Sequence, residues 1–250
     1  MKRVRVTLGE NNPSVLSSMS NLALTYMNQG KYSDAEALFE QCLAKMKVAI
    51  GEKDRNTLTT MTYLADTYDH QGKYREAEFL YMQCLDKQKA LLGESHPDTL
   101  RTVNNLALAY NNQDMFREAE VLFKHCLDKK KLVLGESHPD TLTTMNNLAM
   151  SYYHQVEYRE AEVLFKQCLD KKKEVLGENH PDTLVTMSNL ALAYDHQEKH
   201  REAEVLLKQC LDKMKLVLGE SHPDTLATMR NLARTTQKVE RIQLNESTVN

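Results

Sequence analysis

The feature that most constrains this chain is a strict period of 42 residues. Its five cysteines are each 42 residues apart, and so are six of its glycines. These positions are Cys42, Cys84, Cys126, Cys168 and Cys210, and Gly9, Gly51, Gly93, Gly135, Gly177 and Gly219. A unit of this size cannot bury its apolar residues alone and does so by stacking on its neighbours. The sequence therefore predicts an array of structural repeats.

Each repeat is predicted to contain two helices, as residues 96–137 illustrate. Apolar residues at three- and four-residue steps predict one helix over about 97–112 and a second over about 116–134. Pro97 is suited to the first turn of a helix, and Gly135 is suited to the end of one. Because the polar break between them is short, the two helices are expected to be antiparallel neighbours.

Composition and charge exclude several classes of protein. The 250 residues include 32 Lys and Arg against 35 Asp and Glu, and the net charge of -3 provides no field that would attract nucleic acid. No apolar stretch approaches the roughly 20 residues of a membrane span, and no apolar segment follows the basic start of the chain. We therefore expect a cytoplasmic protein that binds neither nucleic acid nor membrane.

The five cysteines do not resemble a metal or redox site. No CxxC motif or close Cys/His pair accompanies them, and copies one repeat apart should lie at least a helix-packing distance of about 8–10 Å from each other. That separation is too long for a disulfide. We interpret each cysteine as a small residue packed between helices. Motifs for nucleotide binding, zinc proteolysis and acyl transfer are also missing, so we expect no enzyme, no catalytic residue, no metal and no cofactor.

A recurring His-Pro-Asp triplet marks the start of each later repeat. A histidine just before a helix-starting proline is well placed to cap the helix, and the aspartate then lies in its first turn. The histidines are His96, His138, His180 and His222. A co-chaperone J-domain would need this triplet once, in one hairpin loop, so four copies indicate joints between repeats. The lysine runs DKKKL and DKKKE are expected at exposed helix ends, with a basic contact patch as the alternative.

The pattern of the third repeat resembles a known family. Its key positions are Leu106, Ala107, Tyr110, Ala119, Phe123 and Cys126. Their spacing is similar to the tetratricopeptide consensus, in which Leu-Gly-x-x-Tyr is followed by Ala-x-x-x-Phe-x-x-Ala. Lys131 stands where the 34-residue consensus has a helix-ending proline, so the second helix continues and the period grows to 42. This longer form, with HPDTL and NNLALAY, resembles the repeats of kinesin light chains and nephrocystin-3-like proteins over about residues 4–237.

The resemblance implies an all-α fold, an α-solenoid of stacked antiparallel helix pairs. We expect about five full repeats with terminal half-repeats in one solenoid over residues 1–240, because VRVTLGE at the start matches the tail of a second helix. The expected units are 13–54, 55–96, 97–138, 139–180, 181–222 and a half-repeat at 223–238. Residues 239–250 are expected to fray.

The resemblance also implies that the first helix of each pair lines a concave peptide-binding groove. Carried over by position, the groove residues are Asn21, Asn104, Asn105, Leu108, Asn112, Asn146, Asn147, Met150, Tyr153, His154, Asn189, Leu192, His196, Arg230, Asn231 and Arg234. The recurring asparagine amides can bond both edges of a peptide backbone, or they can bond neighbouring helices. Both alternatives stay open from sequence.

These observations lead to the hypothesis of a non-catalytic scaffold that binds a peptide segment of a protein partner, similar to kinesin-light-chain-like cargo adaptors. One alternative is the sensor or oligomerisation region of a larger nucleotide-binding receptor. Another is a designed or duplicated array that has a fold only. Self-association through exposed terminal repeats is a further alternative.

Overall fold

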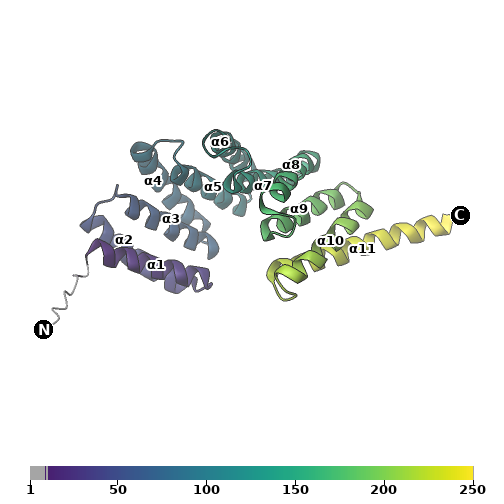
Figure 1. Cartoon of the computed structure of the whole chain (residues 1–250), viewed down its shortest axis with the longest axis horizontal. Helices are drawn as coiled ribbons and strands as arrows, with labels where there is room; N and C mark the ends of the chain where they lie inside the picture. The colour runs from purple at the N-terminus through teal and green to yellow at the C-terminus, as the bar shows by residue number, and fades with distance from the viewer. Residues whose placement is uncertain (1–8, 10, 250) are drawn as a thin grey trace. The chain divides into compact units, whose positions relative to one another are not determined.

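The computed structural model describes residue 9 and residues 11–249, with side chains as far as Asn245 (Figure 1). Its helices are α1 (Pro13–Asn28), α2 (Tyr32–Ala49), α3 (Arg55–His70), α4 (Tyr74–Leu92), α5 (Pro97–Asn112), α6 (Phe116–Leu134), α7 (Pro139–His154), α8 (Tyr158–Leu176), α9 (Pro181–His196), α10 (His200–Val217) and α11 (Pro223–Val249). They form consecutive antiparallel pairs, and no strand occurs among the described residues. The all-α fold of stacked helix pairs that the period predicted is confirmed.

The chain divides into two compact units between Leu122 and Phe123, within α6. In the first unit, α1 to α5 pack in chain order, and α1, α3 and α5 also touch in sequence. In the second unit, α7 to α11 pack in the same way, and α7, α9 and α11 touch in sequence. Such neighbour-to-neighbour packing is what a stack of repeats requires, because its core is built between adjacent elements. A single solenoid domain over residues 1–240 stays a prediction.

The two ends of the chain differ from the interior repeats. The half-repeat predicted from VRVTLGE lies outside the described residues, except for Gly9. At the other end, α11 continues to Val249, beyond the limit of 238 that was expected for the last half-repeat. Residues 239–249 contain neither glycine nor proline, so nothing in the local sequence breaks the helix. Fraying of this segment stays a prediction.

Each odd-numbered helix is capped by the side chain that precedes it. His96 Nδ1 accepts a hydrogen bond from the backbone N–H of Asp98 at 3.1 Å. His138, His180 and His222 make the same bond at 3.1, 3.2 and 3.3 Å, and Asn12 and Asp54 serve as caps in the first two repeats. Such a cap satisfies one of the free donors of the first turn. The interpretation of His-Pro-Asp as a joint between repeats is confirmed.

The cysteine of each repeat is buried where the helices of a pair meet. All five are free thiols with 0 % exposure. The thiols of Cys42, Cys84, Cys168 and Cys210 each donate to the backbone carbonyl of the leucine 26 residues earlier, at 3.2 to 3.3 Å. Burial raises the pKa of these thiols, that of Cys210 to about 12. The interpretation of the cysteines as packed small residues is confirmed.

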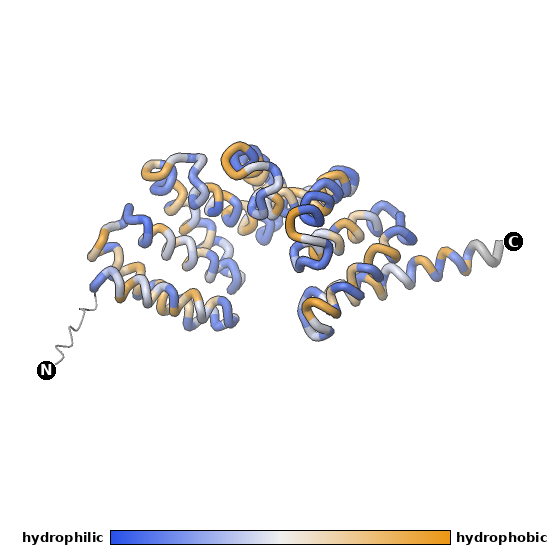
Figure 2. The backbone as a smooth tube through the Cα atoms, in the orientation of Figure 1, coloured by the Kyte–Doolittle hydropathy of each residue, from blue (hydrophilic) through white to orange (hydrophobic). Residues whose placement is uncertain are grey.

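Polar hydrogen bonds join consecutive odd-numbered helices inside each unit. Ser20 bonds Thr60 at 3.1 Å, and Thr186 donates to Asn146 at 3.1 Å. Further pairs with the same separation of 40 residues are Thr62 with Thr102 and Ser188 with Thr228. Figure 2 shows the accompanying alternation of apolar and polar residues along the helices. A buried polar group needs such a partner, so these bonds favour one alignment of adjacent repeats.

The lysine runs are only partly exposed, and the expectation for them needs correction. The middle lysines, Lys130 and Lys172, are 5 % and 4 % exposed. Lys172 donates to the carbonyl of Asp182 at 3.1 Å and to Thr186 at 3.0 Å, and Lys130 makes the equivalent bonds. Burial lowers the pKa of both ammonium groups. The long side chain reaches these acceptors on the first helix of the next repeat, which charge patterning alone does not reveal.

A left-handed residue follows the odd-numbered helix in each full repeat. Gly30 and Gly72 adopt φ 74° and 76°, as their residue type suggests. In later repeats Asp114, Val156 and Glu198 hold the same place at φ 60°, 67° and 64°. A β-branched residue is the least suited to this conformation, because its Cβ branches crowd the backbone. Val156 is therefore a point of stored strain, and its side chain is 67 % exposed.

We predict that Val156→Gly stabilises the protein by about 1 kcal/mol, the steric relief less the entropy cost of glycine. The unfolding midpoint in a denaturant titration followed by circular dichroism measures the change. Val163→Gly is the matched control, since it removes another exposed valine, from the interior of α8, and should cost about 1 kcal/mol. An unchanged or lower midpoint for Val156→Gly would contradict the strain.

Candidate binding surface on the odd-numbered helices

Three aromatic side chains meet in the second unit, at the end of α7, the start of α8 and the end of α9. We call Tyr153, Tyr158 and His196 the Tyr–His cluster. The rings of Tyr158 and His196 stack, with centroids 4.9 Å apart and an interplanar angle of 27°. Tyr153 meets His196 edge-on at 5.3 Å and lies 5.4 Å from Tyr158. Such pairs rigidify a surface and leave ring edges and hydroxyl groups for a ligand.

The contact between Tyr158 and His196 follows from the geometry of the repeat. The first residue of an even-numbered helix lies against the last residue of the next odd-numbered helix, as in the stack of Tyr32 on His70 at 5.2 Å in the first unit. Sequence reasoning identified Tyr153 and His196 but missed Tyr158. The available signal was the aromatic residue that begins α2, α4, α6 and α8, always 38 residues before the end of an odd-numbered helix.

The carboxylate of Asp195 is the shared partner of three basic side chains beside the cluster. Its side chain has 0 % exposure, and its carboxylate accepts bonds from Lys238 Nζ and His200 Nδ1, each at 2.7 Å. Arg234 approaches it at 3.8 Å. Burial alone would raise the pKa of Asp195, but the bonds to Lys238 and His200 outweigh it and lower that pKa. The buried charge therefore fixes α11 against α9.

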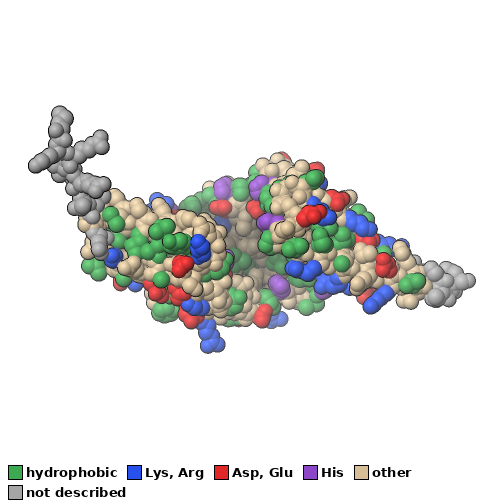
Figure 3. Space-filling model, turned by 90° about the horizontal axis from the view of Figure 1, so that it is seen from below, with side chains coloured by type: hydrophobic (Ala, Val, Ile, Leu, Met, Phe, Trp, Pro, Cys, Tyr) green, Lys and Arg blue, Asp and Glu red, His purple; other side chains and the backbone are tan. Residues whose placement is uncertain are grey.

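The balance of charge at this position is positive. Burial, together with the charges of Arg234 and Lys238, lowers the pKa of His196 despite the neighbouring Asp195. At neutral pH the His196 ring is therefore neutral, with one nitrogen able to donate and the other to accept. The guanidinium of Arg234 is half exposed, and Arg230 one turn earlier is exposed. Figure 3 shows Lys and Arg side chains on the C-terminal part of the surface.

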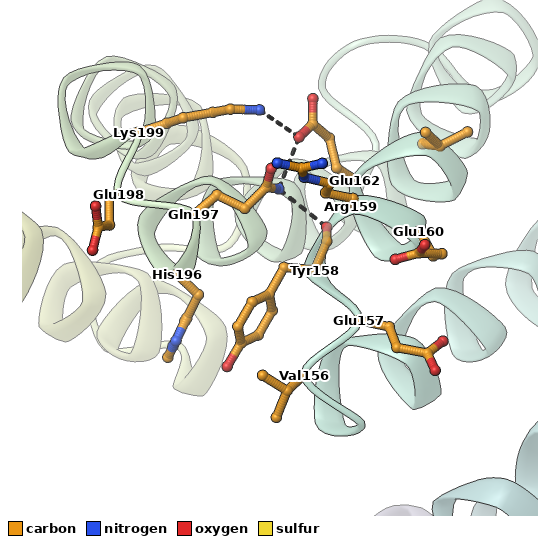
Figure 4. A pocket seen from close by; sticks show the side chains of 11 residues that line it. Val156, Glu157, Tyr158, Arg159, Glu160, Glu162, His196, Gln197, Glu198 and Lys199 are labelled. Atoms are coloured by element: carbon orange, nitrogen blue, oxygen red, sulfur yellow. Dashed lines mark hydrogen bonds and ion pairs between the residues drawn. The ribbon is translucent and has the colours of Figure 1, made fainter.

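A pocket of about 860 Å³ lies beside the cluster, between the start of α8 and the α9–α10 loop (Figure 4). Glu162 accepts bonds from Lys199 at 2.7 Å, Gln197 at 2.8 Å and Lys166 at 2.6 Å. Burial would raise the pKa of Glu162, yet these donors lower it to about 2. Gln197 also donates to the carbonyl of Tyr158 at 3.1 Å. The polar groups on this side of the pocket bond one another, and these bonds hold the Tyr–His cluster in place.

In the first unit, the polar residues of the equivalent surface bond one another. Asp66 accepts from Tyr81 Oη at 2.5 Å and from the Asn105 amide at 2.8 Å. Burial raises the pKa of Asp66 in spite of these donors. The Asn112 amide bonds the carboxylate of Asp69 at 3.1 Å. The amides of Asn105 and Asn112 therefore join neighbouring helices, which is the second of the two alternatives for the asparagines.

Two asparagines assigned to the groove are buried instead. Asn104 is 7 % exposed, and its amide lies 3.4 Å from Asn105 Oδ1. Asn146 is 9 % exposed and accepts from Thr186 at 3.1 Å and from Asn189 at 3.4 Å. Consecutive odd-numbered helices pack closely over these two side chains, so neither amide is accessible to a peptide. This corrects their assignment to the groove.

The other assigned residues reach the surface to different degrees. The exposed ones are Asn21, Asn112, His154, His196, Arg230 and Arg234. The partly buried ones are Asn105, Leu108, Asn147, Met150, Tyr153, Asn189, Leu192 and Asn231. Among the described residues, the amides of Asn21, Asn147 and Asn231 form no hydrogen bond within the chain. The structure brings Tyr153, His154, His196 and Arg234 together, with Tyr153 and His154 edge-on at 5.5 Å.

The fold and this surface define a class of protein: an α-helical repeat array whose candidate site is a binding surface. Within the part of the chain that is described, no group of three His, Cys, Asp or Glu residues could hold a metal ion. None of the described helices is both long and apolar enough to cross a bilayer.

Comparison with known proteins identifies the family. The tetratricopeptide repeat model matches residues 14–90, 98–174 and 140–215. The chain belongs to the tetratricopeptide repeat family. No curated protein matches the sequence.

Solved structures with the same fold include the nearly identical TPR-like repeats of a Podospora anserina protein described as a kinesin light chain. The identity is 28% with a TM-score of 0.69, over 82% of this chain and 97% of that chain. BtubC (BKLC) from P. vanneervenii is 21% identical with a TM-score of 0.68, over 84% of this chain and 83% of that one. A STAND protein with a tetratricopeptide repeat sensor from Pyrococcus horikoshii is 14% identical with a TM-score of 0.68, over 92% of this chain and 34% of its own length.

We predict that Lys238→Met destabilises the protein by about 1–3 kcal/mol at neutral pH, because Asp195 stays buried with one strong cation fewer. The folded pKa of Asp195 is depressed, so its contribution is present above the ordinary value of 3.8 and is lost as the pH falls through the folded pKa. The difference between the two proteins should therefore shrink on acidification.

Denaturant midpoints measured between neutral and acidic pH provide the test. Lys215→Met is the control, since Lys215 meets the exposed Glu220 only at 3.7 Å and should contribute little. A pH-independent difference, or an equal loss in both variants, would show that the buried carboxylate does not depend on Lys238.

Proposed function

We propose that the chain is a non-catalytic scaffold that binds an extended peptide segment of a protein partner on the surface formed by its odd-numbered helices. The mode resembles that of kinesin-light-chain-like cargo adaptors. Membership of the tetratricopeptide repeat family supports a role in protein interaction. The similarity at 28% identity to a protein described as a kinesin light chain supports the comparison with adaptors.

One observation carries the proposal. In the second unit, the Tyr–His cluster lies beside Arg234, while Asn147 and Asn231 keep amides that make no hydrogen bond within the described chain. An amide donates and accepts, so it can bond a peptide backbone at both polar groups. Aromatic rings provide contact area at a small loss of side-chain entropy. The combination fits a peptide with apolar or aromatic side chains.

The charge at α11 supports one orientation for such a peptide. Arg230 and Arg234 are exposed on consecutive turns, and Asp195 is already engaged by Lys238 and His200. An acidic group of the peptide would therefore meet guanidinium groups able to form charge-assisted hydrogen bonds. A basic group would meet repulsion there. We propose that the acidic portion of the peptide lies on α11.

The alternative of a sensor region in a larger nucleotide-binding receptor rests on fold alone. The Pyrococcus horikoshii protein shares the fold at 14% identity, and this chain spans 34% of its length. The adaptor comparison involves higher identity and nearly the whole length of the matched chain. We therefore propose the scaffold as the function.

Selection of a displayed peptide library against the intact chain provides a probe for the surface. We predict that the selected peptides are enriched in acidic residues. The double variant Arg230→Glu with Arg234→Glu should weaken their binding at least about tenfold in fluorescence anisotropy, since two attractive contacts become repulsive. The loss should diminish at high salt, because both arginines are solvent-exposed.

The matched control is Lys53→Glu with Lys89→Glu, which changes the net charge equally at exposed positions of the first unit. It should leave affinity within about twofold, since neither lysine belongs to the proposed surface and both are exposed, where salt screens their charge. A further variant, Tyr153→Ala, tests the aromatic contacts without altering charge. Equal binding by both charge variants, or by Tyr153→Ala and the unmodified chain, would contradict the assigned surface.

A further inference from the structure

The first turns of α11 expose apolar residues that the other repeats bury. Leu226 is 41 % exposed, whereas the equivalent Leu184 of α9 is 0 % exposed. Met229 is 37 % exposed, whereas the equivalent Met187 is 4 % exposed. In α9 these residues pack in the core formed with α10. Among the described residues, α11 thus carries the apolar face of a helix pair with no second helix covering that face.

Ala233 completes this face. It is exposed in α11, whereas the equivalent Ala149 and Ala191 are 0 % exposed. We call Leu226, Met229 and Ala233 the α11 face. Its small third residue allows another helix to approach closely, as the equivalent alanines do within the repeats.

The α11 face lies on a helix that is firmly held from the other side. Thr225, Thr228 and Val239 are 0 %, 1 % and 5 % exposed. Thr228 bonds Ser188 of α9 at 3.3 Å and the sulfur of Met214 in α10 at 3.3 Å. The face is therefore presented by an ordered helix and needs no rearrangement before it binds another element.

The interior repeats show which kind of helix covers such a face. In α10, Ala203, Leu207 and Cys210 are all 0 % exposed, and Cys210 packs with Leu184 and Met187 of α9. The same pattern of small, large and small residues at steps of four and three recurs as Ala77, Tyr81 and Cys84 in α4 and as Ala161, Phe165 and Cys168 in α8. This pattern is complementary to leucine, methionine and alanine on the odd-numbered helix.

Charged residues on the exposed side of α11 indicate which kind of helix could dock on the α11 face. Arg230, Arg234 and Arg241 are exposed on it, against the acidic residues Asp224 and Glu240. The two arginines nearest the α11 face are Arg230 and Arg234. A helix with acidic residues along one flank would gain favourable contacts with them.

We propose that the α11 face docks an amphipathic helix of a partner protein, with the small-x-x-x-large-x-x-small pattern on its apolar side and acidic residues on one flank. A second copy of the chain fits less well. Its described helices with this pattern are α2, α4, α6, α8 and α10, and all of them already bury these residues in their own repeats. Two α11 helices side by side would also bring Arg230 and Arg234 of each copy together.

Synthetic peptides provide the probe. One has the sequence of residues 200–217 with Cys210→Ala, which preserves the pattern and prevents oxidation. The other also carries Lys208→Glu and Lys213→Glu, at positions that are not buried in α10. Titration of fluorescently labelled peptides with the intact chain should give saturable binding, tighter for the acidic peptide by roughly tenfold at low salt.

Ala233→Asp should weaken both complexes by roughly tenfold or more, because it places a charge under the apolar side of the docked helix. Ala37→Asp is the matched control: it makes the same change at an exposed helical alanine on α2 and should leave binding unchanged. Helicity and unfolding midpoints of the two variants should match each other, since both replace an exposed helical alanine with aspartate.

Three results would overturn the proposal. The first is lack of saturable binding by either peptide, and the second is equal binding by the Ala233→Asp variant. The third is a concentration-dependent dimer of the chain alone in analytical ultracentrifugation that Ala233→Asp abolishes, which would place a second copy on the face. Both proposals use Arg230 and Arg234, so Tyr153→Ala distinguishes them: it tests the Tyr–His cluster and leaves Leu226, Met229 and Ala233 of the α11 face intact.

Discussion

The close packing of an even-numbered helix on its odd-numbered partner is the contact on which the rest of the structure depends. Small residues make it possible: Ala161 and Cys168 of α8 have 0 % exposure, and the Cys168 thiol reaches the Leu142 carbonyl of α7 at 3.2 Å. Such interiors tolerate little change in volume. Because each pair is closed in this way, neighbouring pairs stack in register, and the odd-numbered helices present side chains at regular intervals.

The role of a residue could be predicted from sequence where that role depends only on the residue type and its neighbours along the chain. His138 caps α7 through Nδ1, and Gly72 adopts a positive φ, as the residue types indicate. The prediction was wrong for Asn146 and Lys172, because burial of a polar side chain depends on a hydrogen-bond partner in another helix. Thr186 is that partner for both residues, since it accepts from Lys172 and donates to Asn146. The period gives the position of such a residue in its helix, but it does not show which residue of another helix bonds it.

The candidate site consists of polar and aromatic groups that this packing leaves available. In the first unit, Asp66 and Asn105 satisfy each other, whereas in the second unit the amide of Asn147 forms no hydrogen bond within the described chain and Arg230 is exposed. Sequence placed Tyr153 and His196 on the surface through the family resemblance. It missed Tyr158, which belongs to the other helix of the pair and reaches His196 only after the pairs stack. Binding thus depends on differences between repeats, and folding on what they share.

The most direct test of this account is a nuclear magnetic resonance titration of the isotope-labelled chain with a library-selected peptide. Binding on the odd-numbered helices predicts the largest shifts at the side-chain amides of Asn147 and Asn231 and at the ring of His196. The buried amide of Asn146 should move least among the asparagines of the second unit. Shifts concentrated instead at the exposed Val163 and Val205 of the even-numbered helices would contradict the account.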